Sequence, residues 1–421
     1  MPPVLPARSA QVIHRRRVLQ LAAGSAALAG LSRRGVNAQS SATPQATPAP
    51  ATPGAAAPKP TAIIVSATND PLRVAGSDGM DHLEYDLIVT NAFPEAVTIT
   101  LIDVLGADGQ VLQRVEGTAI AAITQPVLGV GPITQISGSM TVAVVMDLIV
   151  PRDDVHDRID HRITYELPAD AELASLVGSF LIEGPLLTVD PRPAITIAPP
   201  LHGPGWLTFS GVGDLPSLHR SIRLPVDGGT YAKSETFAID WIQLVDGRAF
   251  EGDGMSIEQW YAYGADVTSA TAGTVVAVRD GMPNEVPNAV PENVRELADY
   301  GGNQVTVHVG DDVWAFYGHL ISDSLAVAVG DSVMPGQVLG RLGNSGNTTA
   351  PHLHFGLLNG PDPLANNSLP MVFDSYTLRG VLDEASRGSF LSAEGEGPEI
   401  VGPPREEHGT LALNWTVTDF A

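Results

Sequence analysis

Cysteine is absent from this 421-residue chain, and aromatic residues make up only 5% of it. Without cysteine there is no disulfide, no thiol nucleophile and no thiolate metal ligand, so any bound metal must be held by His, Asp or Glu. The few aromatics stand beside 43 glycines and 34 prolines, a composition that favours many short elements joined by turns over long helices. Hydrophobic residues still reach 44%, enough for the cores of two ordinary domains.

Positive charge is also scarce. The chain has 23 Lys and Arg against 47 Asp and Glu, a formal net charge of −24. Residues 1–38 contain arginines but no acidic residue, so the remaining chain is more acidic still. A body of this charge repels nucleic acids and anionic lipids, and we expect neither as a partner. The sequence gives no indication of the oligomeric state.

Long apolar runs are missing, so we expect no membrane span after the N-terminal segment is removed. Residues 1–38 have the order of a signal peptide, with Arg15, Arg16 and Arg17 before an apolar run over residues 18–31 and a small-residue cleavage site ending at Ala38. The paired arginines predict a twin-arginine signal peptide and export to the cell envelope or the medium. Residues 39–60, rich in Pro, Ala and Thr, predict an extended linker.

Residues 61–200 predict a β-sandwich domain. Short β-branched runs occupy residues 85–90 and 97–102, separated by a turn-rich patch, and further runs occur at residues 140–150, 162–167 and 194–197. Several short strands at this spacing are typical of an immunoglobulin-like antiparallel sandwich. We expect this region to act as a spacer or a binding domain rather than as a catalytic domain.

Residues 201–421 predict a second, antiparallel β-sheet domain, in which glycine-bounded strands recur over residues 267–270, 273–278, 304–309, 313–316, 338–342 and 352–357. The fold class is therefore all-β. Residues 282–300, with three prolines, interrupt the pattern as a long loop, and loops of this length inside a compact domain are usually functional or mobile.

His352 and His354 are two residues apart in a segment of strand character, so the pleat places both side chains on one face and turns Leu353 and Phe355 to the core. Two imidazoles side by side can both bind a metal, or one can bind while the other transfers protons. From this pair alone, two interpretations are equally supported: a metal site, or two surface histidines without a common function.

The surrounding residues resemble the lysostaphin-type (LytM-like) zinc metalloendopeptidase family, whose members cleave peptide bonds in peptidoglycan. The resemblance covers residues 231–360, about a third of the chain, with five segments in the family's order. They are 263–267 (YGADV) with 273–276 (GTVV), 302–305 (GNQV), 317–320 (YGHL), 329–340 (VGDSVMPGQVLG) and 343–355 (GNSGNTTAPHLHF).

The resemblance implies roles for individual residues. Asp240, in the sequence Phe237-Ala238-Ile239-Asp240, and His354 correspond to zinc ligands. His319 and His352 correspond to the residues that flank the attacking water, act as general base and stabilise the tetrahedral intermediate. Zn²⁺ is thus the implied cofactor, and a peptide or peptidoglycan the implied substrate.

One family ligand is missing, because the histidine expected four residues before Asp240 is replaced by Thr236. A neutral hydroxyl is a poor zinc ligand. Our preferred third ligand is His219, just upstream, followed by Glu235 and then His202. The alternatives are a site with only two protein ligands and extra waters, or no metal site at all.

The sequence therefore predicts an exported zinc metalloendopeptidase acting on peptidoglycan. The alternative is a catalytically inactive cell-wall binding or regulatory module that has lost its metal site. The position of the His219 side chain relative to Asp240 and His354 distinguishes these two hypotheses.

Overall fold

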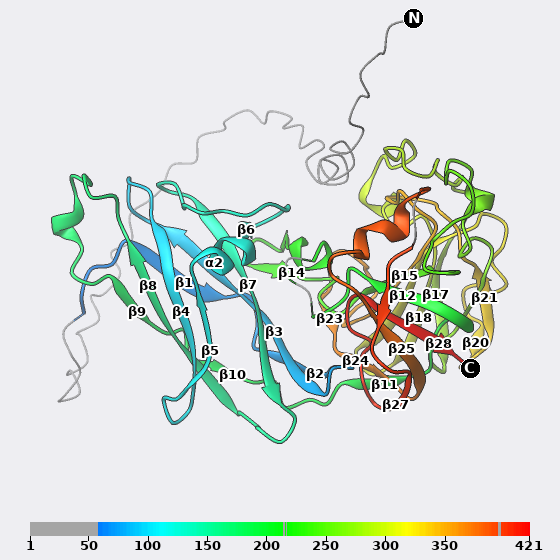
Figure 1. Ribbon diagram of the computed structural model, residues 1–421, viewed down its shortest axis with the longest axis horizontal. Helices are drawn as coiled ribbons and strands as arrows, with labels where there is room; N and C mark the ends of the chain where they lie inside the picture. The colour runs from blue at the N-terminus through cyan, green and yellow to red at the C-terminus, as the bar shows by residue number, and fades with distance from the viewer. Residues whose placement is uncertain (1–57, 214, 216, 395–396) are drawn as a thin grey trace, which may run out of the picture.

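The computed structural model describes residues 58–213, 215, 217–394 and 397–421. The predicted signal peptide (1–38) and nearly all of the predicted linker (39–60) lie outside the described residues. The fold is all-β, and two β-rich halves lie side by side (Figure 1). Among the described residues, no helix has both the length and the apolarity needed to cross a membrane.

The N-terminal half is a sandwich of two five-stranded sheets. One sheet contains β1 (Ile63–Ala67), β2 (Leu72–Ala75), β3 (Met80–Asn91), β6 (Thr124–Pro126) and β7 (Thr141–Pro151). The other contains β4 (Thr98–Gly106), β5 (Val111–Glu116), β8 (Arg158–Glu166), β9 (Leu181–Glu183) and β10 (Leu187–Thr188). The short helix α2 (Thr118–Ile123) connects β5 to β6 and buries Ile120. The immunoglobulin-like character of the sandwich stays a prediction.

The two sheets bury a shared core. Tyr85 and Leu87 of β3 and Ile102 and Val104 of β4 are fully buried in the same hydrophobic cluster. Alternate residues of β3 point to opposite faces, because successive side chains in a strand alternate. Leu83, Tyr85 and Leu87 therefore fill the sandwich, while Glu84 and Asp86 are left on the outer face of the sheet.

The C-terminal half is built on one twelve-stranded sheet. Its main path runs β20–β17–β18–β19–β22–β15–β12–β28–β25–β26, with β23 beside β22 and β27 beside β25. The strands are β12 (Gly203–Phe209), β15 (Ile239–Gln243), β17 (Gly273–Arg279), β18 (Asn303–Gly310), β19 (Val313–Leu320), β20 (Ser332–Val333), β22 (Leu353–Leu358), β23 (Ser368–Leu369), β25 (Tyr376–Leu382), β26 (Ile400–Val401), β27 (Arg405–Glu407) and β28 (Thr416–Phe420). The C-terminal strands β25 to β28 thus belong to the same sheet as β19 and β22, which carry His319 and His354.

Three two-stranded sheets complete this half: β11 (Ile195–Ile197) with β24 (Met371–Phe373), β13 (Leu224–Val226) with β14 (Thr230–Ala232), and β16 (Asp266–Thr268) with β21 (Val338–Arg341). The prediction that the strand at residues 194–197 belongs to the sandwich is wrong. β11 pairs in parallel with β24, and Ile197 is buried in the C-terminal core. The sequence of a three-residue strand does not indicate which strand it pairs with. Its domain is therefore decided by the tertiary structure alone.

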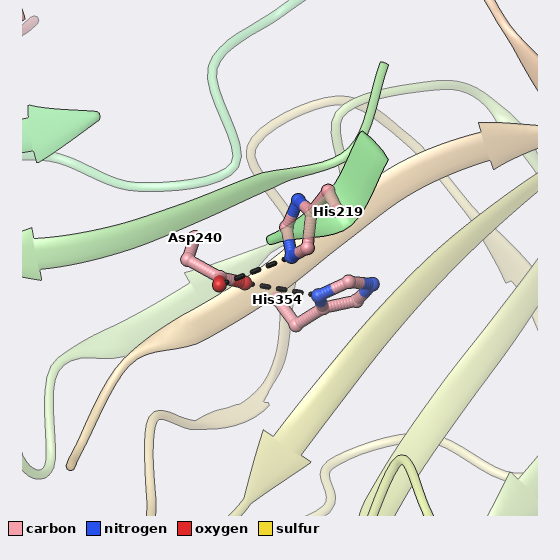
Figure 2. Close-up of side chains that lie close together, drawn as sticks. All are labelled: His219, Asp240 and His354. Atoms are coloured by element: carbon pink, nitrogen blue, oxygen red, sulfur yellow. Dashed lines mark hydrogen bonds and ion pairs between the residues drawn. The ribbon is translucent and has the colours of Figure 1, made fainter. Parts of the chain in front are cut away.

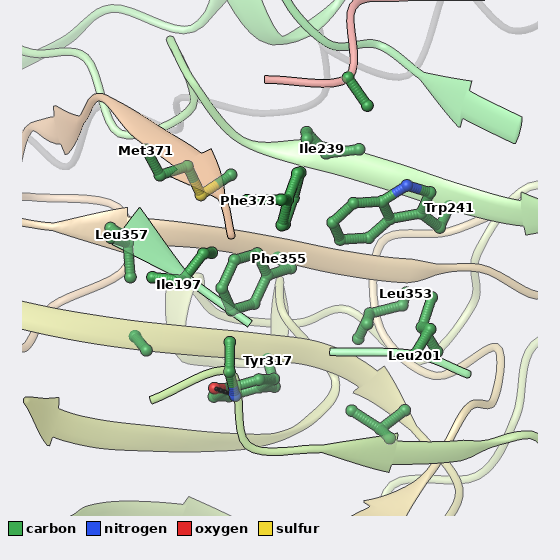
Figure 3. Packing of buried hydrophobic residues seen from close by; sticks show 14 of the residues in the cluster. Ile197, Leu201, Ile239, Trp241, Tyr317, Leu353, Phe355, Leu357, Met371 and Phe373 are labelled. Atoms are coloured by element: carbon green, nitrogen blue, oxygen red, sulfur yellow. Dashed lines mark hydrogen bonds between the residues drawn. The ribbon is translucent and has the colours of Figure 1, made fainter. Parts of the chain in front are cut away.

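The core beneath the motif strands is apolar and rich in aromatics (Figure 3). Leu353 and Phe355 are fully buried, as the alternation of β22 predicts. The Phe355 ring lies 5.0 Å from Tyr317 and 6.1 Å from Trp241, measured between ring centroids. These contacts hold β22 against its neighbours, and the alternate residue His354 is consequently turned to the opposite face.

Candidate metal centre

Strand register brings two of the predicted ligands together. β15 and β22 run antiparallel with Asp240 directly opposite His354, so both side chains emerge on the same face. Asp240 Oδ1 lies 2.9 Å from His354 Nδ1. The pairing follows from the hydrophobic alternation of the two strands, because a shift by one residue would turn the ligands into the core.

His219 reaches the same point from outside the sheet. It begins a single turn of 3-10 helix, His219–Ser221, and its Nε2 atom lies 3.1 Å from Asp240 Oδ2. Figure 2 shows both imidazoles on one side of the Asp240 carboxylate, each joined to it by a dashed line. Their ring centroids are 4.9 Å apart.

The donor set fits a zinc ion. One ligand atom from each of His219, Asp240 and His354 lies within 4.8 Å of the other two. Two imidazoles and one carboxylate with an open fourth position are a usual donor set for catalytic zinc. The Nδ1–H of His219 donates to the carbonyl oxygen of Ala238 at 3.0 Å, which leaves the Nε2 lone pair free to bind a metal.

The other candidates for the third ligand are placed differently. Thr236 is buried but is not part of the ligand group. Glu235 lies beside His219, with Oε2 4.0 Å from Nε2, and lines the same cavity. His202 is exposed and bonds to the carbonyl oxygen of Ala421, so the structure does not bring it to the site.

His319 and His352 lie beside the ligand group. His319 is the penultimate residue of β19 and donates from Nδ1 to the carbonyl oxygen of Ser345 at 2.8 Å, which leaves its Nε2 free. His352 donates from Nδ1 to Ala350 at 2.8 Å and places Nε2 3.4 Å from Asp240 Oδ1. Their ring centroids are 4.6 Å apart, so both histidines can contact one substrate group.

The electrostatic environment separates these histidines. Burial lowers the pKa of His319 well below its usual value, and the neighbouring His352 and His354 lower it further. Burial also disfavours the charged form of His352, but the Asp240 carboxylate outweighs it and raises the pKa of His352. Burial likewise opposes protonation of His219, yet Asp240 raises its pKa to about 9. Zinc must therefore displace a proton from His219 to bind there.

The ligand group opens into a cavity of about 260 Å³, which we call the central cavity. Its polar residues include Glu235, Tyr300, Gln304, His319, His352 and His354. Most of the wall is apolar: Val130, Phe209, Leu218, Ile222, Ile242, Leu297, Phe316, Pro363, Leu364 and Leu391. A cavity with apolar walls and a few convergent polar groups is the usual form of a small-ligand or active site.

Sequence reasoning missed several of these residues. Val130 comes from the connection between β6 and β7, in the other half of the chain. Leu297 and Tyr300 come from the long loop over residues 282–300, which therefore forms part of the cavity wall. The length of that loop predicts a functional or mobile segment, but nothing in the sequence indicates that Val130 lies nearby.

A second group of possible metal ligands lies in the sandwich, where His82, Glu84 and Asp147 come within reach of one another. His82 Nδ1 is 3.0 Å from Asp147 Oδ1, and its Nε2 is 3.3 Å from Asp78 Oδ2. Glu84 forms an ion pair with Arg220. The side chains thus have partners of their own, and we interpret the group as buried ion pairs.

Comparison with known proteins agrees with the motif segments. Residues 253–366 match peptidase family M23. The match includes His319, His352 and His354, whereas Asp240 and His219 lie before it.

Solved structures of similar proteins include the catalytic domain, in a mutant form, of the prophage-encoded M23 protein EnpA from Enterococcus faecalis. It is 22% identical over 41% of this chain and 92% of that chain, with a TM-score of 0.25. The catalytic domain of lysostaphin from Staphylococcus simulans is 25% identical over 29% of this chain and 86% of that chain, with a TM-score of 0.19. A putative M23 peptidase from Pseudomonas aeruginosa is 14% identical over 66% of this chain and 89% of that chain, with a TM-score of 0.23.

Proposed function

Because residues 253–366 of this chain belong to peptidase family M23, we propose that the protein is a zinc-dependent endopeptidase that hydrolyses peptide bonds in peptidoglycan. One observation carries the proposal: His219, Asp240 and His354 lie within ligand distance of one another. In this proposal His219 takes the place of the family histidine that Thr236 replaces. The binding-module alternative has no comparable support, because it requires a site that lacks a third ligand.

The residues around the site suit hydrolysis of an amide. A bound zinc ion supplies Lewis-acid polarisation of the scissile carbonyl and lowers the pKa of the attacking water. His319, with Nδ1 bonded to Ser345 and Nε2 free, accepts the proton of that water. His352 stabilises the developing negative charge on the carbonyl oxygen. The apolar walls of the central cavity favour peptide segments with small, uncharged side chains.

We also propose that the protein acts outside the cytoplasm, in the cell envelope or the medium, where peptidoglycan is found. The support for this location is the twin-arginine pattern in residues 1–38.

The decisive experiment measures zinc content by elemental analysis in the purified protein and its His219→Ala variant. His202→Ala is the matched control, since His202 is an exposed histidine away from the site. We expect about one zinc per chain in the wild type and the control, and a marked loss in His219→Ala, because a third ligand strongly increases zinc affinity. The same samples are incubated with purified peptidoglycan, and the release of new amino groups is measured with and without a chelator.

Zinc-dependent release of amino groups by the wild type supports the enzyme. A wild type that takes up no zinc after incubation with the metal, but sediments with peptidoglycan, overturns the proposal in favour of a binding module.

A further inference from the structure

The turn that carries His219 has little local support. It is three residues long and belongs to no sheet. It is followed by β13, which pairs only with β14. A short 3-10 turn has poor intrinsic stability, so its position over Asp240 must be fixed by side-chain contacts. The contact between His219 Nδ1 and Ala238 orients the ring but does not anchor the backbone of the turn.

The anchors are two arginines that follow His219. Arg220 is buried and pairs with Glu84 and Asp86 of β3, with Nη2 2.9 Å from Asp86 Oδ1. The same guanidinium donates to the carbonyl oxygens of Tyr85 and Met146, at 3.1 and 3.2 Å. Every one of these acceptors lies in the N-terminal sandwich.

Arg223 extends the same network. It is fully buried, and its Nε lies 2.7 Å from Asp86 Oδ2. It also donates to the carbonyl oxygen of Arg220, so the two arginines are linked directly by a hydrogen bond. Lys233 Nζ lies 3.2 Å from Asp86 Oδ2. Burial lowers the pKa of Lys233 to about 7, and the two guanidiniums face the carboxylates of Glu84 and Asp86.

Buried charges of this kind are costly to desolvate and strongly destabilising when one partner is removed. They define a unique geometry, since each guanidinium is held at several acceptors at once. Glu84 and Asp86 lie on the face of β3 opposite the sandwich core, and this alternation points them at the peptidase half. The network therefore joins the outer face of one domain to the metal-ligand turn of the other.

We propose that the N-terminal sandwich is a positioning part of the metal centre: Glu84 and Asp86 hold Arg220 and Arg223, and thereby hold His219 at ligand distance from Asp240. The inference rests on the proposed function for the identity of the metal. It assigns a role to the sandwich and identifies Asp86, which contacts Arg220, Arg223 and Lys233, as the central residue.

The test measures the zinc dissociation constant of the full chain by competition with a chromophoric chelator. The variants are His219→Ala, Asp86→Asn and the double variant. Asp103→Asn is the matched control, because Asp103 is an equally buried carboxylate of the sandwich that pairs with Arg114 instead. All five tryptophans lie between residues 206 and 415, so their near-UV circular dichroism reports whether the peptidase half stays folded.

We expect Asp86→Asn to weaken zinc binding by roughly 10- to 100-fold, the range found for residues that orient metal ligands. The double variant should bind no more weakly than His219→Ala, because a ligand already displaced cannot be lost again. The visible absorption of the Co²⁺-loaded Asp86→Asn protein should change in the same way as that of His219→Ala. Asp103→Asn should bind zinc like the wild type.

Wild-type affinity in Asp86→Asn, beside weakened binding in His219→Ala, overturns the positioning role and leaves the proposed function intact. Additive losses in the double variant also overturn it, since the sandwich then acts through another route. Undiminished affinity in His219→Ala refutes the ligand set itself, and the positioning role with it. If Asp86→Asn does not fold, Glu84→Gln combined with Arg220→Gln removes one charge of each sign, and the same expectations apply.

Discussion

At the scale of single residues, the backbone of His319 orients the side chain that we propose as the general base. Its backbone is left-handed, with φ of 63°, which costs a non-glycine residue about 1–3 kcal/mol. Hydrogen bonds hold it there: its amide donates to Gly301 at 2.8 Å, and its carbonyl accepts from Gly343 at 3.0 Å. The side chain is consequently turned away from the direction that β19 would impose, towards His352.

Replacement of this histidine tests its proposed role as general base. We expect His319→Ala to lower kcat by about 10²- to 10⁴-fold, the usual contribution of a positioned base, while zinc content stays at the wild-type level. The measurements are hydrolysis of a peptide substrate and elemental analysis. His308→Ala is the control, since His308 bonds to the carbonyl oxygen of Asp311 outside the cavity. Loss of zinc in His319→Ala would instead identify His319 as a ligand.

His82 gives a pH-dependent prediction in the sandwich. Burial opposes its protonation, but hydrogen bonds to Asp147 and Asp78 raise its pKa to about 9. A pKa raised above the unfolded value of 6.5 stabilises the fold fully below pH 6.5, and this contribution is lost as the pH rises through 9.

We therefore expect His82→Gln to cost on the order of 2–3 kcal/mol of unfolding free energy near pH 6. The difference between variant and wild type should shrink towards pH 10. Urea denaturation followed by far-UV circular dichroism at several pH values measures it. A difference that stays constant over this range contradicts the ion-pair interpretation.

At the scale of elements, the loops that contain Gly302 and Gly346 are in close backbone contact beside the site. Gly302 and Gly346 both have positive φ, 65° and 84°, and their backbones touch. A Cβ at Gly346 would lie 2.4 Å from the amide nitrogen of Gly302 and 2.7 Å from the carbonyl oxygen of Tyr300. This close approach positions the carbonyl oxygen of Ser345 to accept the hydrogen bond from His319.

Because of this contact, we expect Gly346→Ala to lower the free energy of unfolding by about 3 kcal/mol, from left-handed backbone strain and overpacking together. Activity should fall as well, because Ser345 no longer orients His319. Gly336→Ala is the control: its φ of 82° is similar, but nothing lies within 4 Å of its Cβ, so only about 1 kcal/mol is expected. Equal losses in thermal or urea denaturation would show that the contact contributes nothing.

Strands were predictable to the extent that their side chains alternate. The patterns at residues 85–90 and 313–316 lie within β3 and β19, which are longer, and the pattern at residues 140–150 coincides with β7 apart from a shift of one residue. Composition and side-chain alternation depend on local strand propensity and on burial of one face. They therefore predict long, regular strands correctly. Pairing partners and the extension of the sheet by β25 to β28 depend on distant residues, and local patterns do not contain them.

At the scale of the whole molecule, both halves build the cavity. β2 of the sandwich contributes Val74 to the C-terminal core, and Ala75 and Ser77 exchange backbone hydrogen bonds with Leu411. The β6–β7 connection places Val130 in the wall of the central cavity. The sandwich thus meets the C-terminal half at several points and also bounds the central cavity.

This arrangement predicts a separable effect on substrate binding. Val130→Asp introduces a charge into an apolar wall, so we expect KM for an uncharged peptide to rise by about 10-fold. Zinc content should be unchanged, because Val130 is not among the ligands. Steady-state kinetics and elemental analysis measure the two effects. Leu128→Asp is the control, since Leu128 is 46% exposed in the same connection and does not line the cavity.

The sequence by itself determined the all-β class, the family motif and the positions of Asp240, His319, His352 and His354, because short motifs and strand alternation are local properties. It also limited the third ligand to a few residues, with His219 preferred. Only the tertiary structure decided which of these reaches Asp240, because the turn of His219 is held by Asp86, 134 residues from Arg220 in the chain. Contacts across such a separation form only when both domains have folded and buried charge is neutralised between them.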